Sequence, residues 1–149
     1  MQIEKDYYSL PEILQRWSIG EDDLIYLAEN NQVRLSIRVF DQFLEFGDYD
    51  LDRDGTRFCI PVEERVFSGL LDLHASDVFH LFRCGEAHLK EFRFERCGYA
   101  AFLDDHPPHC VVIGDLLMRR SERDRFEIKS GFRAVGATAP EQGFIFASG

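Results

Sequence analysis

Residues 8–39, YSLPEILQRWSIGEDDLIYLAENNQVRLSIRV, decide the fold that we expect for this chain. Ser9 and Glu12 have the spacing of a capping box, in which the two side chains satisfy backbone N–H groups at the start of a helix. From Leu10 to Trp17, apolar residues recur at the spacing of one helix face. The sequence therefore predicts a first helix that buries this face.

A second helix is predicted directly after the first. Residues 18–20 interrupt the apolar pattern, and the three acidic residues at 21–23 suit the positive N-terminal end of a new helix. The asparagines at 30 and 31 favour the left-handed conformation in which helices commonly end. Two helices joined by so short a turn predict a helix-turn-helix unit.

The chain after this unit is predicted to be mixed. Residues 33–46 alternate as a strand does, residues 48–55 form a turn cluster, and residues 56–62 predict a return strand that ends near Pro61. A second helix–strand unit begins near Leu70, with a helix that stops at Gly85. Near the end, Ser121 is the predicted cap of a short helix that carries Phe126 and Ile128.

We therefore expect an α+β fold with a winged-helix-like N-terminal unit, antiparallel hairpins and a second helix–strand unit. Residues 1–130 would form a single compact domain, with the winged-helix-like unit at 1–40 and the second unit at 68–130. Residues 131–149 are expected to be a docked tail, because they end in the apolar triplet Phe144-Ile145-Phe146.

The composition limits the classes of protein that fit. Hydrophobic residues make up 45% of the 149 residues, which is typical of a folded chain. No stretch approaches the roughly 18 apolar residues of a membrane-spanning helix, and the acidic N-terminus is unlike a secretory signal. We expect a cytoplasmic protein with reduced cysteines. The net charge of −10 opposes nucleic-acid binding by the protein as a whole.

The charge is unevenly distributed. Residues 119–133 contain six basic and three acidic residues, a net charge of +3 that leaves −13 for the rest of the chain. This segment is either a solvated helix with internal ion pairs or a basic contact face on an acidic body.

Two patterns raise the possibility of a bound metal. Asp50-x-Asp52-x-Asp54-Gly55 matches the first half of a calcium loop, but Pro61 stands where the twelfth-position glutamate belongs, so an acidic hairpin tip is favoured. Zinc-ligand residue types occur in two further groups, but neither has a standard spacing: Cys97, His106, His109 and Cys110, and His80, Cys84 and His88. We predict no metal site.

No motif for a reaction is present. The sequence has no nucleophile elbow, no P-loop and no dinucleotide-binding glycine pattern. A cysteine could meet a histidine in space, but no local signature supports such a pair. We therefore predict no catalytic residues, no cofactor and no enzymatic activity.

Residues 7–39 resemble the winged helix-turn-helix of the excisionase and MerR-type DNA-binding families. The segments that carry the resemblance are Tyr8–Trp17, Ile19–Leu24 and Asn31–Val33, and residues 116–126 are similar to the short basic helix that closes the wing in those families. The resemblance implies a winged-helix scaffold whose second helix faces the ligand.

The second helix departs from that pattern in its charge. Its exposed positions include Ile25, Tyr26 and Glu29, and three acidic residues precede them. Burying one unpaired carboxylate costs several kcal/mol, whereas a good base contact contributes only about 1–3 kcal/mol. We therefore predict a non-enzymatic regulatory protein of bacterial or mobile-element type, which binds a protein partner and occupies a basic nucleic-acid-binding groove on it. The predicted contact residues are Glu21, Asp22, Ile25, Tyr26 and Glu29.

The alternative is a sequence-specific DNA-binding transcriptional regulator of excisionase or MerR type, acting as a homodimer. In that case the phosphate contacts would come from Arg16, Arg34, Arg38, Arg119, Arg120 and Arg123.

Overall fold

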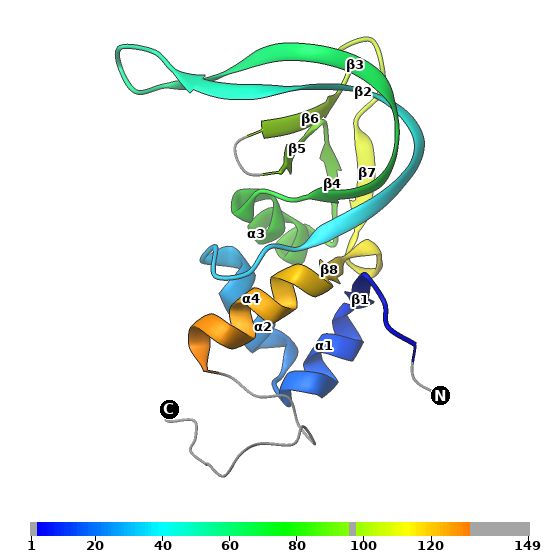
Figure 1. Ribbon diagram of the computed structural model, residues 1–149, viewed down its shortest axis with the longest axis vertical. Helices are drawn as coiled ribbons and strands as arrows, with labels where there is room; N and C mark the ends of the chain where they lie inside the picture. Colours follow the sequence, from blue (N-terminus) through cyan, green and yellow to red (C-terminus); the bar gives the residue numbers. More distant parts are fainter. Residues whose placement is uncertain (1–2, 96–97, 132–149) are drawn as a thin grey trace.

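A computed structural model describes residues 3–95 and 98–131 of the chain (Figure 1). The expected α+β fold is confirmed, with four helices and two antiparallel sheets in the described part. The helices are α1 (Leu10–Trp17), α2 (Glu21–Glu29), α3 (Ala75–Cys84) and α4 (Arg120–Ser130). The strands are β1 (Tyr7–Ser9), β2 (Ser36–Leu51), β3 (Arg57–Asp72), β4 (Glu86–Leu89), β5 (Glu91–Phe94), β6 (Gly98–Phe102), β7 (His109–Val112) and β8 (Leu117–Arg119), with one 3-10 turn at Ile113–Asp115. The predicted docked tail lies outside the described residues from position 132 onward.

The N-terminal helices form as their local signals predict. The Glu12 N–H donates to Ser9 Oγ at 3.3 Å, and the Ser9 N–H donates to Glu12 Oε1 at 2.9 Å, so the capping box is complete. The buried face of α1 ends at Trp17, which packs against Phe126 of α4 with ring centroids 4.9 Å apart. α2 ends before Asn31, whose φ of 60° lies in the left-handed region as expected.

The hairpin of β2 and β3 is much longer than predicted. Both strands have 16 residues, and β3 runs through Pro61 and on to Asp72. Pro61 lies opposite Gly47 at a shift in register where Val62 has no partner, and such a bulge accommodates a residue that lacks an N–H. The expected end of this strand near Pro61 is therefore wrong.

A second bulge bends the hairpin nearer its base. Here Phe40 and Asp41 of β2 face Ser68 alone, Asp41 has a positive φ of 52°, and its N–H donates to Ser68 Oγ at 2.9 Å. Figure 1 shows the paired strands curving over the rest of the molecule, with the tip reaching away from it. The acidic turn that resembles a calcium loop forms this tip. There the Asp52 carboxylate accepts the N–H groups of Asp54 and Thr56.

The curved hairpin closes a ring of strands. The six-stranded sheet has the order β1-β8-β2-β3-β5-β6, and β6 also pairs with β2 from Leu44 to Asp48. The four strands β2, β3, β5 and β6 therefore close on themselves, as strands do in a small barrel, and enclose a common interior. The rings of Phe46, Phe67 and Phe94 touch one another there, with centroids 4.9–5.5 Å apart, and they join three of these strands.

The last helix begins differently from the prediction. Strand β8 pairs with β1 as far as Arg119, which lies opposite Tyr7, so the chain passes directly from strand into α4. Arg119 is therefore the N-cap residue, and Ser121 lies inside the helix. Of the two apolar residues that this helix carries, Phe126 packs against the core and Ile128 is 82% exposed. In the described part of the chain, no helix is long and apolar enough to cross a membrane.

Gly47 gives a test of the closed ring. A Cβ at this position would lie 2.2 Å from the Ile60 carbonyl oxygen and 2.9 Å from the buried Tyr99 ring. We expect Gly47→Ala to lower the free energy of unfolding by about 1–3 kcal/mol, because the backbone of β3 or the Tyr99 ring must move. Urea denaturation measures the difference. Gly114→Ala is the control, because a Cβ there meets nothing within 4 Å; equal unfolding midpoints for the two variants would contradict the predicted ring packing.

Candidate functional site

The outer face of α2 presents most of the predicted protein-contact residues to solvent. Tyr26 is 65% exposed, Glu21 and Asp22 are exposed, and Ile25 is half-buried. In the described part of the chain, neither Glu21 nor Asp22 forms an ion pair or a side-chain hydrogen bond. We call Glu21, Asp22, Ile25 and Tyr26 the α2 patch.

Glu29 differs from the rest of the predicted set. Arg83 of α3 donates to Glu29 Oε2 at 2.7 Å, and the Glu29 side chain is only 15% exposed. Its charge is therefore balanced within the protein, and Glu29 holds α2 against α3 rather than offering a free carboxylate.

The pairing of α2 with α3 places an aromatic residue beside the Glu29–Arg83 contact. Phe79 of α3 is 47% exposed, and the Arg83 guanidinium lies 3.5 Å from the centre of its ring. The two helices lie next to each other (Figure 1). The sequence signal for an outward Phe79 is its position about 100° around the helix from Val78, which places it at or beyond the border of the buried face.

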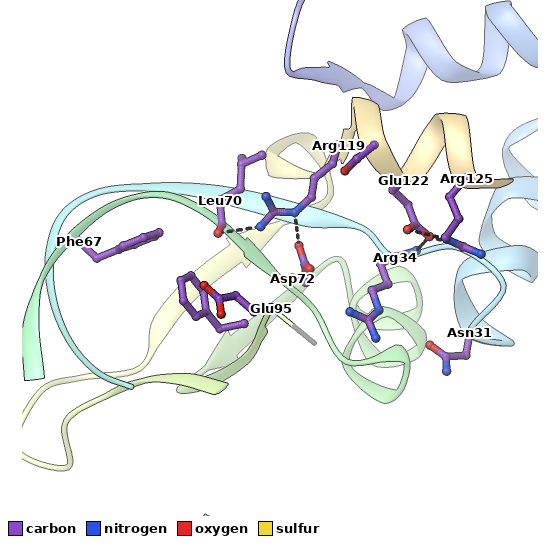
Figure 2. A pocket seen from close by; sticks show the side chains of 11 residues that line it. Asn31, Arg34, Phe67, Leu70, Asp72, Glu95, Arg119, Glu122 and Arg125 are labelled. Carbon is purple, nitrogen blue, oxygen red and sulfur yellow. Dashed lines mark hydrogen bonds and ion pairs between the residues drawn. The ribbon is translucent and has the colours of Figure 1, made fainter. Parts of the chain in front are cut away.

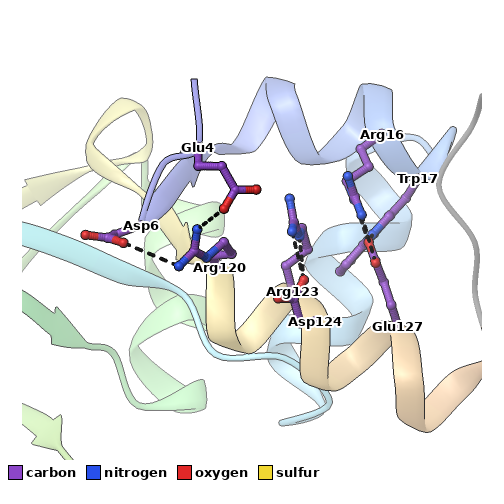
Figure 3. Close-up of polar contacts among 8 residues, drawn as sticks. All are labelled: Glu4, Asp6, Arg16, Trp17, Arg120, Arg123, Asp124 and Glu127. Atoms are coloured by element: carbon purple, nitrogen blue, oxygen red, sulfur yellow. Dashed lines mark hydrogen bonds and ion pairs between the residues drawn. The ribbon is translucent and has the colours of Figure 1, made fainter. Parts of the chain in front are cut away.

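Four of the six arginines predicted as phosphate contacts are bound to carboxylates. Arg16 donates twice to Glu127, at 2.7 and 3.0 Å, and Trp17 Nε1 donates to the same carboxylate at 2.6 Å (Figure 3). Burial opposes the charge of Glu127, but the hydrogen bonds from Arg16 and Trp17 outweigh it and hold the pKa of Glu127 below its usual value. These contacts join α1 to α4.

The other paired arginines lie at and near the start of α4. Arg120 contacts Glu4 at 2.7 Å and Asp6 at 3.8 Å, and Arg123 contacts Asp124 at 2.8 Å (Figure 3). The basic segment is thus a helix whose arginines are largely neutralised by acids nearby in space, some of them more than 100 positions away in the chain.

Arg119 belongs to a buried network and borders a cavity of about 870 Å³ (Figure 2). It donates to the buried Asp72 at 2.8 Å and to the Leu70 carbonyl at 2.9 Å, and Ser36 Oγ donates to the same aspartate at 2.6 Å. Arg34 lines this cavity too, and among residues 3–95 and 98–131 its guanidinium makes no hydrogen bond or ion pair. Of the predicted phosphate contacts, Arg34 and the exposed Arg38 remain unpaired within the described residues.

A cluster that the sequence did not reveal surrounds Glu91 of β5. Tyr49 donates its hydroxyl proton to Glu91 Oε2, His74 Nε2 lies 3.1 Å from the same oxygen, and Cys59 Sγ lies 3.6 Å from the other. Arg93 Nε donates to His74 Nδ1 at 3.4 Å, so the neutral His74 ring carries its proton on Nε2. The cluster joins the distal hairpin to β5 and to the start of α3.

The protonation states of this cluster indicate that it holds the strands together and does not supply a reactive group. Burial raises the pKa of Cys59, and the Glu91 charge raises it further, so the thiol stays protonated at neutral pH. Burial and the Glu91 contact likewise raise the pKa of Tyr49. Glu91 thereby accepts hydrogen bonds on both oxygens. No local motif predicts this meeting, because it depends on the register of β2, β3 and β5.

Within the described part of the chain, the residues considered as zinc ligands do not lie together in the two groups that the sequence suggested. Cys97 lies outside the described residues, His106 contacts Asp105 at 2.9 Å, and the His109 ring stacks on Phe102. Cys110 instead lies on β7 opposite His88 of β4. The helix α3 stops at Gly85 as expected, so His88 does not share a helix face with His80 and Cys84.

Comparisons of the chain with protein-family models, with curated proteins and with solved structures find no match. The functional class therefore rests on the surface and the charges described above.

His74 gives a prediction for the dependence of stability on pH. Burial lowers the pKa of His74 below 6.5, although the Glu91 charge opposes this, and the Arg93 charge lowers it further. Below pH 6.5 the unfolded chain takes up a proton that the folded chain does not, so stability falls as the pH falls. We expect His74→Gln to flatten the unfolding free energy between about pH 7.5 and 5.5, measured by urea denaturation. The exposed His106→Gln is the control; if it flattens the profile equally, His74 is not the cause.

Proposed function

We propose that this protein is a non-enzymatic binding protein that docks a basic surface of a protein partner on the α2 patch. The observation that carries the proposal is the exposure of Tyr26 on a helix whose Glu21 and Asp22 have no counter-charge among the described residues. An exposed tyrosine is a common anchor of protein interfaces. Acids beside it favour a partner rich in lysine or arginine and hasten association with it.

We propose in addition that α1, α2, the β2–β3 hairpin and α4 form a winged-helix type of scaffold. The chain order of helix, short turn, helix, strand and hairpin supports this, and so does the packing of α4 against α1 through Trp17 and Phe126. In such a scaffold the second helix is the element presented to a ligand. Here that element is α2, with its acidic and aromatic surface.

The charge of this surface makes a basic groove on a nucleic-acid-handling protein the best-fitting partner site. A groove that binds a phosphate backbone carries lysine and arginine, and the α2 patch offers carboxylates to them. The net charge of −10 steers the whole molecule toward such a groove. Bound there, the protein would block access of nucleic acid.

Direct DNA binding is less well supported. To contact phosphates, Arg16, Arg119 and Arg120 would have to leave the carboxylates that they contact. Leaving buried Asp72 without its arginine carries a large penalty, because a buried charge would lose its partner. Arg34 and Arg38 remain as the arginines that favour this alternative.

Substitutions in the α2 patch test the proposal. The partner is captured with the wild-type protein, purified, and its Kd measured by calorimetry. We expect Tyr26→Ala to weaken binding by about 2 kcal/mol or more, roughly 30-fold. The double variant Glu21→Lys with Asp22→Lys should slow association and weaken its salt dependence. Glu64→Lys, an exposed acid on β3, is the control and leaves Kd within about 2-fold.

A gel shift with DNA separates the alternative. If wild-type protein binds DNA with a steep loss of affinity in salt, and Arg34→Ala and Arg38→Ala abolish that binding, the protein is a DNA-binding regulator. Equal partner affinities for Tyr26→Ala and the Glu64→Lys control would remove the α2 patch from consideration.

A further inference from the structure

Three metal-ligating side chains meet on the small sheet formed by β4 and β7. They are the carboxylate of Glu86, the imidazole of His88 and the thiol of Cys110, and their ligand atoms all lie within 4.8 Å of one another. None of them belongs to the α2 patch or to the Glu91 cluster. All three are exposed, so an ion can reach them from solvent.

The strand pairing explains why they share one face. His88 lies directly opposite Cys110 in the antiparallel pair, and Glu86 lies two residues before His88 on the same strand. Residues two apart on a strand point to the same side, as do directly opposed residues of neighbouring strands. The two strands are short and well separated along the chain. The fold, and not a sequence motif, therefore brings these three side chains together.

The chemistry of the donors selects a class of ion. A thiolate, an imidazole and a carboxylate suit zinc, whereas magnesium and calcium prefer oxygen ligands alone. Zinc bonds of about 2.0–2.3 Å place tetrahedral ligand atoms about 3.3–3.8 Å apart. Glu86 Oε2 and His88 Nε2 are already 3.1 Å apart, and small rotations of exposed side chains bring the third ligand into range.

Among the three described cysteines, Cys110 has distinct surroundings. Cys59 contacts Glu91, and Cys84 Sγ lies 3.7 Å from His80 Nδ1. Within the described residues, Cys110 forms no hydrogen bond, although two ligand groups face it. Its sulfur is therefore free to become a ligand.

We propose that Glu86, His88 and Cys110 bind one zinc ion, with water in the fourth position. Binding releases the thiol proton of Cys110 to solvent and leaves the sulfur as a thiolate ligand. The ion would link β4, which directly follows α3, to β7, which leads through the 3-10 turn toward β8 and α4. It would thus act as a clip across the four-residue ladder that pairs the two strands.

Cobalt(II) is the probe for this site. Reduced, metal-free full-length protein is titrated with cobalt chloride and followed by absorption. We expect saturation at one equivalent, visible bands of a tetrahedral ion and a near-ultraviolet thiolate-to-cobalt band, all bleached when zinc displaces the cobalt. Cys110→Ser should abolish the thiolate band. Replacing a residue that only supports a metal ligand through a hydrogen bond typically weakens metal binding by roughly 10- to 100-fold. Because His88 would itself be a ligand, we expect His88→Ala to raise the Kd for cobalt by more than that.

A matched control comes from the second Cys–His pair. His80 and Cys84 offer two ligands on α3 without a carboxylate in the same group. We expect the double variant His80→Ala with Cys84→Ser to retain the cobalt spectrum. Circular dichroism checks that each variant is folded. A thiolate band that persists in Cys110→Ser, or that is lost in the control, overturns the proposal, as does cobalt uptake that fails to saturate at one equivalent.

A thermal readout gives an independent check. Because an ion that binds only the folded state stabilises it by mass action, zinc should raise the Tm of the wild-type protein and leave that of Cys110→Ser unchanged. An equal rise in both proteins would show that zinc stabilises the chain through other groups, and it would contradict the clip.

Discussion

The pairing of β2 with three different strands is the constraint on which the rest of the structure depends. Near its start, β2 lies between β3 and β8, and from Leu44 to Asp48 it lies between β3 and β6. Ser36 sits at the first of these junctions, where its hydroxyl and Arg119 both donate to buried Asp72. Because β8 also pairs with β1, this junction connects the N-terminal helices and α4 to the ring. The Glu91 cluster, reached by Tyr49, is placed by the far end of the same strand.

Local signals in the sequence were sufficient for the helices α1 and α2. The capping box at Ser9 and the left-handed Asn31 need only neighbouring residues, and both are present in the structure. The length of β3 was not predictable in this way. Pro61 usually ends a strand, and it is tolerated here because the bulge at Val62 removes the need for its N–H. That bulge depends on the partner strand, which a local pattern does not contain.

In the candidate sites, too, some features follow from local sequence and others depend on contacts between distant elements. The exposure of Tyr26 and Asp22 followed from the amphipathic pattern of one helix, and the structure agrees. The Glu29–Arg83 pair spans 54 residues, and the Arg16–Glu127 pair spans 111. Such pairs decide which charges remain available to a ligand, and they can be identified only when the elements have been placed in space. The meeting of His88 with Cys110 is another such case, since it needs the register of two strands.

The bulge at Pro61 also bears on how the protein behaves at high concentration. Along most of its length, β3 has a partner on one side only within the described residues, and such an open edge can recruit a second chain. Phe58, Ile60 and Val62 are at least 40% exposed on this strand, which adds to that hazard. The charged residues at 63–65, next to the bulge, interrupt the edge where a foreign strand would align. The charges beside the bulge thus oppose self-association through the edge that the hairpin leaves open.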